Sequence, residues 1–185
     1  MAFTLQLGEK APGFTLPATD GKSYSLIDFN DSEILVIFFT CNHCPYVKAI
    51  RKRLVRDTRE LRDLGINSVA VMSNDPTLYI EDSFESMQAV AAKYDFPFPY
   101  LQDETQGVAK AYGAICTPDF FGYNSDMQLQ YRGRLDASGK EAAAPDARRD
   151  LFEAMRLVAE TGEGPENQLP GIGCSIKWRD EADQT

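Results

Sequence analysis

The sequence has no long apolar run, since the longest, Ile34–Phe39, is far shorter than the ~20 residues that a membrane-spanning helix needs. Its first residues, MAFTLQLGEKAPGF, also lack the basic segment followed by an apolar stretch that is typical of a secretory signal. We therefore expect a soluble, cytoplasmic protein that does not contact a membrane.

Cysteine and histidine are scarce, with four cysteines and one histidine among 185 residues. This cysteine content is well below that of small secreted scaffolds held together by disulfides. In a reducing compartment the resting state of these cysteines is the free thiol, so any disulfide in this protein is expected to be transient.

Basic residues are also in the minority. There are 19 Lys and Arg against 28 Asp and Glu, which gives a formal net charge of −9. A field of this sign repels phosphate backbones and argues against nucleic acid as a partner. No GxGxxG or Walker-type loop is present, so we expect no bound nucleotide, flavin or other cofactor.

The remaining composition, 43% hydrophobic and 25% charged, is that of an ordinary globular protein, and the length fits one domain. We expect this domain to span residues 1–162. The segment 163–185 has little hydrophobic periodicity and is expected to form a tail that packs on the domain or trails from it. The oligomeric state is not set by any of these features.

Two segments read as strands buried on both faces, namely Ile34–Thr40 (ILVIFFT) and Ser68–Met72 (SVAVM). Between them, apolar residues recur at helical spacing over Pro45–Leu64, and Gly65 ends this helix. A second amphipathic helix is predicted from Ile80 to Tyr94. The resulting βαβα order indicates parallel strands joined by a crossover helix.

The flanking segments complete the predicted fold. Turn-forming residues in Leu7–Leu26 favour an N-terminal hairpin. A short helix is expected near Thr105–Tyr112, followed by an antiparallel hairpin of Asp119–Tyr123 and Met127–Leu135 and by a last helix near Pro145–Glu160. We therefore expect an α/β fold with a mixed central β-sheet flanked by helices, an N-terminal β-hairpin extension and an irregular C-terminal tail.

The motif that carries chemistry is Cys41-Asn42-His43-Cys44-Pro45, between the first buried strand and the following helix. Two cysteines at this spacing can close a disulfide within one helical turn. The free N–H groups and the dipole of the helix favour a thiolate there. A CxxC pair can also be half of a zinc site, but a strand before it and a helix after it favour redox chemistry.

At these residues the sequence resembles the thioredoxin superfamily, and within it the redoxin branch of thiol-disulfide oxidoreductases and alkyl-hydroperoxide-reductase-like proteins. The resemblance extends over nearly the whole chain. It rests on LGEKAPGFTL and DGKSYSL near the start, on ILVIFFTCNHCPYV, on CTPDFFGY and on YRGRLD. It implies a thioredoxin-like fold and a cis proline beside the redox cysteines, which places Thr117 and Pro118 at the site that receives substrate.

Within this resemblance, Cys41 is expected to be the more exposed thiol and to attack a substrate disulfide, and Cys44 to resolve the mixed disulfide. A protonated His43 beside the helix N-terminus would stabilise the Cys41 thiolate. Asn42, Thr117 and Pro118 are expected to contact the substrate. The substrates would be thiols and disulfides of proteins or small molecules, with electrons from an external electron-donor protein.

The sequence departs from thioredoxins at two positions. Leu35 stands where thioredoxins carry a buried carboxylate, and Thr40 stands where a tryptophan usually precedes the first cysteine. Resolution of a mixed disulfide would then depend on His43, on water or on another acid.

Two alternatives remain open. In a peroxiredoxin-like thiol peroxidase Cys44, followed by proline, would attack the peroxide, but Cys41 replaces the Thr or Ser expected three residues earlier. Arg132 or Arg134 would supply a guanidinium near that site. A non-catalytic module would bind zinc through Cys41, Cys44, Cys116 and Cys174, although we expect no metal. In the redox interpretation, Cys116 and Cys174 are possible accessory thiols.

Overall fold

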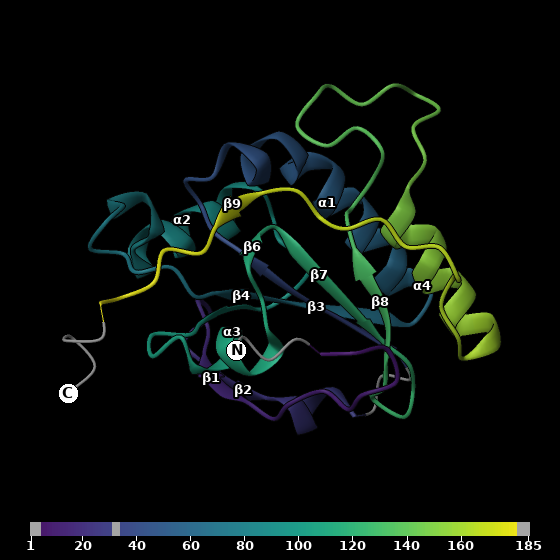
Figure 1. Ribbon diagram of the computed structural model, residues 1–185. Helices are drawn as coiled ribbons and strands as arrows, with labels where there is room; N and C mark the ends of the chain where they lie inside the picture. The colour runs from purple at the N-terminus through teal and green to yellow at the C-terminus, as the bar shows by residue number, and fades with distance from the viewer. Residues whose placement is uncertain (1–4, 31–33, 181–185) are drawn as a thin grey trace.

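A five-stranded mixed sheet forms the centre of the molecule in a computed structural model that describes residues 5–30 and 34–180 (Figure 1). Strands β3, β4 and β5 run parallel, while β7 runs antiparallel to β3 and β8 antiparallel to β7. In spatial order the strands are β5 (Tyr100–Gln102), β4 (Ile66–Met72), β3 (Ile34–Thr40), β7 (Asp119–Tyr123) and β8 (Leu129–Gly133). The predicted mixed α/β sheet is confirmed.

The central strand β3 is buried on both faces because its side chains alternate between two apolar clusters. Val36 and Phe38 pack in the cluster that includes residues of α1 (Pro45–Asp63), α2 (Phe84–Lys93) and α4 (Asp150–Thr161). Leu35 and Phe39 pack in the other, with residues of α3 (Gly107–Tyr112) and the N-terminal segment. Figure 1 shows these two layers on opposite sides of the sheet.

Two small antiparallel ribbons complete the fold. β1 (Thr15–Pro17) pairs with β2 (Ser23–Ser25), which confirms the predicted N-terminal hairpin. β6 (Cys116–Thr117) pairs with β9 (Cys174–Ser175). Short 3₁₀ helices occur at Leu26–Phe29 and Ile80–Asp82. No helix of the described part of the chain is both long enough and apolar enough to cross a membrane.

Helix α1 agrees with its prediction to within one residue. Gly65 follows the helix with a φ of +82° and donates its N–H to the Arg62 carbonyl, so it terminates α1 as predicted. The crossover from β3 through α1 to β4 therefore follows directly from the local pattern.

Two helices begin later in the chain than predicted. The second helix begins at Phe84 rather than Ile80, because the Ser83 hydroxyl caps it by accepting the Ser86 N–H. The last helix begins at Asp150 rather than Pro145. There Arg53 donates to the carbonyls of Gly139 and Glu141 and helps to hold the preceding segment as a loop.

Two short strands, β5 and β9, were not predicted. Strand β5 follows Pro97 and Pro99 in a segment where no strand was expected. The tail also contains β9, whose register with β6 places Cys174 opposite Thr117. Ile176 just beyond β9 is 3% exposed, so this part of the tail is built into the domain.

Candidate active site

The Cys41–Pro45 motif lies where β3 ends and α1 begins. Cys41 directly follows the buried Thr40, and Cys44 is the N-cap residue of α1, with Pro45 in the first turn. Proline is favoured there because the first N–H groups of a helix have no acceptor within the helix. The motif therefore puts the Cys44 sulfur beside the free N–H groups of the helix N-terminus, as the sequence predicts.

Thr117 contacts both cysteines of the motif. Its Oγ1 lies 3.4 Å from the Cys41 Sγ, and its carbonyl oxygen accepts a hydrogen bond from the Cys44 thiol at 3.4 Å. The Thr117–Pro118 peptide bond is cis. The structure thus brings together four residues that the sequence analysis selected from two distant segments of the chain.

Both redox cysteines are buried, with 1% of Cys41 and 0% of Cys44 exposed. The expectation of a more exposed Cys41 is therefore wrong. Both thiols lie in the main apolar cluster, where Cys41 adjoins Thr117, His43 and Asp82, and the tail strand β9 pairs along β6 next to Thr117. All four cysteines of the chain are free thiols in this structure.

The acidity order of the pair also differs from the expected one. A hydrogen bond from the Cys41 thiol is the main cause that lowers the pKa of Cys44 to about 4, and contacts from Cys174 and the Val47 backbone act in the same direction. The same contact with Cys44, together with burial and the charge of Asp82, raises the pKa of Cys41. The lowered pKa of Cys44 therefore makes it the first thiol of the pair to lose its proton, while the protonated Cys44 thiol is the form that donates to Thr117.

Asp82 is a site residue that the sequence analysis missed. Its side chain is fully buried, and its Oδ1 accepts the backbone N–H groups of Asn42 and His43 at 2.7 and 3.1 Å. Its Oδ2 accepts from Asn74 at 3.0 Å and faces the His43 Nδ1 at 2.5 Å. Three N–H donors and the imidazole of His43 thus converge on one carboxyl group, which holds the motif backbone in place.

His43 is oriented by this carboxylate on one edge and by an aromatic ring on one face. Its imidazole stacks on Tyr79, with 3.8 Å between ring centroids and 3° between ring planes. Because a carboxylate only accepts hydrogen bonds, the Nδ1 of His43 donates to Asp82. The dyad adjoins Cys41, since one ligand-type atom from each of the three residues lies within 4.8 Å of the others.

These three residues are the only group of metal-ligand type found within residues 5–30 and 34–180. The four-cysteine set of the zinc alternative is not assembled as such a group. In addition, the oxygens of Asp82 are already used by four hydrogen-bond donors. The arrangement is therefore that of a hydrogen-bonded dyad beside a thiol.

The expected role of Asn42 in contacting substrate is not supported. Asn42 is 3% exposed, its amide donates to the Glu81 carbonyl at 2.9 Å, and its Oδ1 accepts from the Tyr100 hydroxyl at 2.9 Å. The backbone carbonyl of Asn42 accepts from Arg51 at 3.1 Å. These contacts leave the side chain to position the motif from inside the protein.

The two arginines proposed for a peroxidase site are occupied elsewhere. Arg132 donates to the Gly113 carbonyl at 2.8 Å and to Asp119 at 3.2 Å. Arg134 forms an ion pair with Asp150 at 2.6 Å. Neither guanidinium is directed at Cys44, so the expectation that one of them serves this cysteine is wrong.

The two accessory cysteines differ in their relation to the site. Cys174 packs against the apolar cluster that contains Cys41 and Cys44, and its proximity helps to lower the pKa of Cys44, while burial is the main cause that raises the pKa of Cys174 to about 11. Cys116 instead directs its thiol to the Pro118 carbonyl at 3.6 Å, and burial raises its pKa to about 12. Of the two, Cys174 is the one in contact with the redox pair.

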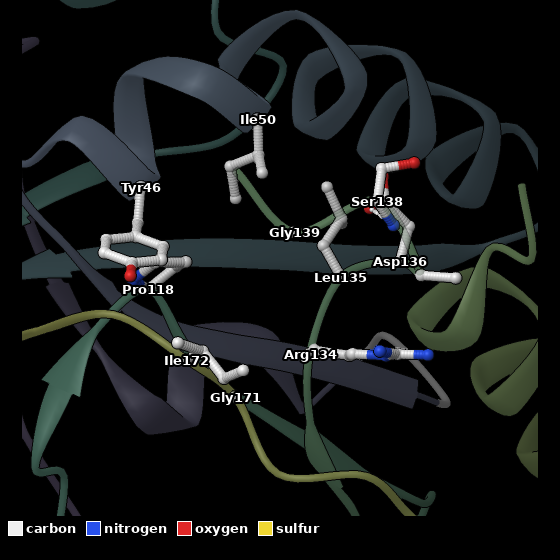
Figure 2. A pocket seen from close by; sticks show the side chains of 11 residues that line it. Tyr46, Ile50, Pro118, Arg134, Leu135, Asp136, Ser138, Gly139, Gly171 and Ile172 are labelled. Carbon is white, nitrogen blue, oxygen red and sulfur yellow. Dashed lines mark hydrogen bonds between the residues drawn. The ribbon is translucent and has the colours of Figure 1, made fainter. Parts of the chain in front are cut away.

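A pocket of about 170 Å³ opens beside Pro118 (Figure 2). Tyr46 of α1 and Ile172 of the tail flank Pro118 in this view, and Ile50 and Leu135 add to the apolar wall. The pocket lies next to the redox pair in the fold, because Tyr46 follows Cys44-Pro45 and Pro118 follows Thr117.

The sequence of residues 7–135 matches the model of the AhpC/TSA family. The chain belongs to the AhpC/TSA family. The predicted thioredoxin superfamily membership and redoxin branch are confirmed, and the protein is a thiol-dependent oxidoreductase.

Curated relatives carry peroxiredoxin names. The chain is 27% identical over 136 residues to peroxiredoxin Bcp of Escherichia coli K12, which covers 74% of this chain and 82% of that protein. It is 31% identical over 116 residues to the chloroplastic peroxiredoxin Q of Populus jackii, covering 62% of this chain and 49% of that protein.

Solved structures give a higher similarity. A conserved protein of Geobacillus kaustophilus is 44% identical, with a TM-score of 0.89 and coverage of 95% of this chain and 94% of that chain. A protein of Sinorhizobium meliloti 1021 is 37% identical, with a TM-score of 0.90 and coverage of 96% and 97%. The thioredoxin domain of a Bacteroides vulgatus thiol-disulfide oxidoreductase, at 16% identity, TM-score 0.62 and coverage of 85% and 98%, shares the fold.

Proposed function

We propose that this AhpC/TSA family protein exchanges a Cys41–Cys44 dithiol for a disulfide with thiols and disulfides of small molecules or proteins. The observation that carries the proposal is the joint contact of both thiols with Thr117. The helix N-terminus at Cys44 supports it, because a thiolate is the form that attacks a disulfide.

The acidity order assigns the first step to Cys44, the reverse of the order expected from the sequence. The Cys44 thiolate attacks a disulfide RSSR, forms a Cys44–S–S–R bond and releases RS⁻. The Cys41 sulfur then attacks Cys44, closes the Cys41–Cys44 disulfide and displaces the second RS⁻. The proton of Cys41 leaves with one of the two thiolates, so one RSSR yields one RSH and one RS⁻.

The His43–Asp82 dyad supplies the proton acceptor that is missing at the position of Leu35. Its place beside Cys41 suits transfer of the Cys41 proton as the second disulfide bond forms. We assign the return of electrons to an external electron-donor protein and propose the cytoplasm as the compartment, where the four cysteines would rest as free thiols.

The test is a redox titration of the full chain in a dithiothreitol series, with alkylated thiols counted by mass spectrometry and metal measured in the same sample. We expect two thiols to disappear together and to map to Cys41 and Cys44. A Cys116→Ser variant is the control and keeps the transition. A pair that stays reduced throughout, or that oxidises only after zinc is removed, contradicts the proposal.

A second candidate function is thiol peroxidase activity at Cys44. It is favoured by the low pKa of Cys44 at the start of α1 and by the similarity to peroxiredoxin Bcp. Cys41 occupies the position three residues before Cys44, where its thiol replaces a hydroxyl. The Cys41→Ser variant separates this activity from dithiol exchange.

A further inference from the structure

The C-terminal tail lies across the mouth of the redox site. In Figure 1 it passes in front of α1 and pairs through β9 with β6. The register sets Cys174 opposite Thr117 and Ser175 opposite Cys116. Thr117 is the residue that contacts both Cys41 and Cys44, so the tail pairs with the strand that the two redox thiols touch.

The backbone of the tail is fitted closely to this strand at Gly173. A Cβ added to Gly173 would lie 2.1 Å from the Thr117 carbonyl oxygen and 3.1 Å from the Pro118 nitrogen. Both are backbone atoms that cannot turn away. Only glycine therefore allows the tail to approach the Thr117–Pro118 peptide this closely.

Contacts beyond β9 anchor the tail on the far side of Cys174. Ile176 is buried and donates its N–H to the Ile115 carbonyl at 3.3 Å. The N–H of Lys177 donates to the Asn74 side chain at 2.9 Å, and its carbonyl accepts from Gln106 at 2.9 Å. The close approach at Gly173 and the contacts of Ile176 and Lys177 therefore fix the segment on both sides of Cys174 and keep Cys174 packed beside Cys44.

Cys174 lies where a cysteine of a substrate peptide would lie if that peptide paired with β6. An extended peptide that adds to the edge of a strand gains main-chain hydrogen bonds and presents alternate side chains to the surface beneath it. β9 makes this kind of pairing with β6, and Cys174 packs against the cluster that contains Cys44, opposite the residue whose carbonyl contacts the Cys44 sulfur.

We propose that β9 is a tethered substrate strand and that Cys174 is a third redox thiol, which forms a reversible disulfide with Cys44. This inference rests on the proposed dithiol exchange. While β9 is paired, the edge of β6 is closed to an external peptide, so the protein reacts with small disulfides in preference to extended polypeptides.

The chemistry needs no oxidant beyond a small disulfide RSSR. The Cys44 thiolate attacks it, forming Cys44–S–S–R and releasing RS⁻. The Cys174 sulfur then attacks the Cys44 sulfur, forming Cys44–S–S–Cys174 and displacing R as a thiolate, which takes the Cys174 proton to become RSH. Attack by the Cys41 sulfur on the Cys44 sulfur then forms the Cys41–Cys44 disulfide and displaces Cys174 as a thiolate, which takes the Cys41 proton and returns to the thiol.

The first experiment removes the competing thiol. Reduced full-length Cys41→Ser is treated with 2-hydroxyethyl disulfide, and disulfide-linked peptides are followed by mass spectrometry. We expect the mixed disulfide on Cys44 to convert to a Cys44–Cys174 link. In Cys41→Ser/Cys174→Ser the mixed disulfide should persist, while the matched control Cys41→Ser/Cys116→Ser should behave like Cys41→Ser.

The outcomes separate this inference from the proposed function. One outcome is that the wild-type chain closes the Cys41–Cys44 disulfide while Cys41→Ser keeps its mixed disulfide, as Cys41→Ser/Cys174→Ser is expected to do. That result would overturn the role of Cys174 and leave the proposed dithiol exchange in place. If the wild-type chain closes no Cys41–Cys44 disulfide, the proposed function itself fails.

A second experiment displaces the strand and leaves all cysteines in place. In Gly173→Ala the new Cβ should force β9 away from Thr117, so we expect iodoacetamide to modify Cys44 about tenfold faster, as for a locally opened segment. Gly13→Ala is the control, because its added Cβ meets no atom within 4 Å and Gly13 has no positive φ. Equal Cys44 modification rates in both variants would show that β9 does not cover the site.

Discussion

The Nδ1 of His43 lies 2.5 Å from the Oδ2 of Asp82, so a fully buried carboxylate orients the only histidine in the chain beside the redox cysteines. The same carboxylate accepts two backbone N–H groups of the motif. One side chain thus shapes the motif and places a negative charge next to Cys41.

Replacement of Asp82 tests both effects. Asp82→Asn removes the charge that helps to raise the pKa of Cys41, so this pKa should fall. It also weakens hydrogen bonds to a buried charged acceptor, and the free energy of unfolding should drop by about 2–3 kcal/mol. Denaturant titration and the pH dependence of thiol alkylation measure these changes. The control is Asp95→Asn, at a carboxylate that is 96% exposed and should change neither quantity.

His43→Ala is expected to act on Cys41 in the opposite direction. The carboxylate of Asp82 would lose its imidazole donor and face Cys41 uncompensated, so the pKa of Cys41 should rise further and Cys41 alkylation near neutral pH should slow several-fold. Alkylation rates mapped to Cys41 at a series of pH values provide the measurement. An unchanged profile would remove His43 from the electrostatics of the site.

The low pKa of Cys44 predicts a specific pH dependence of stability. This pKa is about 4 in the folded protein against 9.0 for an ordinary thiol. Between these values the unfolded chain binds a proton that the folded chain has released, so stability should rise with pH from about 4 to 9. The contribution is lost as pH falls through 4. Above pH 9 the raised pKa of Cys41 should make stability fall with pH, because the unfolded chain then releases a proton that folded Cys41 keeps.

Unfolding free energies of the reduced protein and of Cys44→Ala, measured across this pH range, test the prediction. Their difference should grow from pH 4 to 9. The oxidised wild-type protein, which has no titrating thiol at Cys44, should lack this slope. A constant difference would show that Cys44 carries no thiolate in the folded state.

The Thr117 hydroxyl is expected to assist Cys41 directly. Its contact with the Cys41 sulfur lowers the pKa of Cys41 against the other influences. Thr117→Val keeps the side-chain shape but removes this contact, so closure of the Cys41–Cys44 disulfide should slow by about fivefold, the equivalent of a hydrogen bond worth about 1 kcal/mol. Stopped-flow measurement of closure after mixing with a small disulfide provides the test, and the exposed Thr15→Val serves as control. Equal rates would argue against the contact.

Cys41→Ser distinguishes peroxidase chemistry from dithiol exchange. The substitution places a hydroxyl three residues before Cys44 and removes the Cys41 thiol. If Cys44 is a peroxidatic cysteine, the variant should still consume about one equivalent of hydrogen peroxide per chain while its two-thiol exchange is lost. Cys44→Ser should lose both. Absence of peroxide consumption in Cys41→Ser leaves dithiol exchange as the activity of the site.

The local sequence pattern was sufficient to predict the strand and the helix that carry the redox motif. The apolar run Ile34–Thr40 predicted a strand buried on both faces, and apolar spacing with Gly65 predicted α1. Both signals lie within the segments themselves, because burial of a whole strand and termination of a helix depend on adjacent side chains and backbone angles. The chemistry of the cysteine pair followed from the same junction.

Elements set by hydrogen bonds to other parts of the chain were harder to predict. Asp82 lay in a segment predicted to be helical, and only the absence of a carboxylate at Leu35 indicated that another acid was needed. Likewise, the sequence around Cys174 contains no periodicity that predicts a strand, because β9 consists of two residues and exists through its pairing with β6.

The fold class, the order of β3, α1 and β4 and the redox motif are thus encoded in short stretches of sequence, where periodicity and turn residues act between neighbours. The burial of both thiols, the lowered pKa of Cys44 and the contacts of Asp82 and Cys174 come from the tertiary structure. Acidity and access depend on groups brought within a few ångströms by folding, and those groups come from segments distant in the chain.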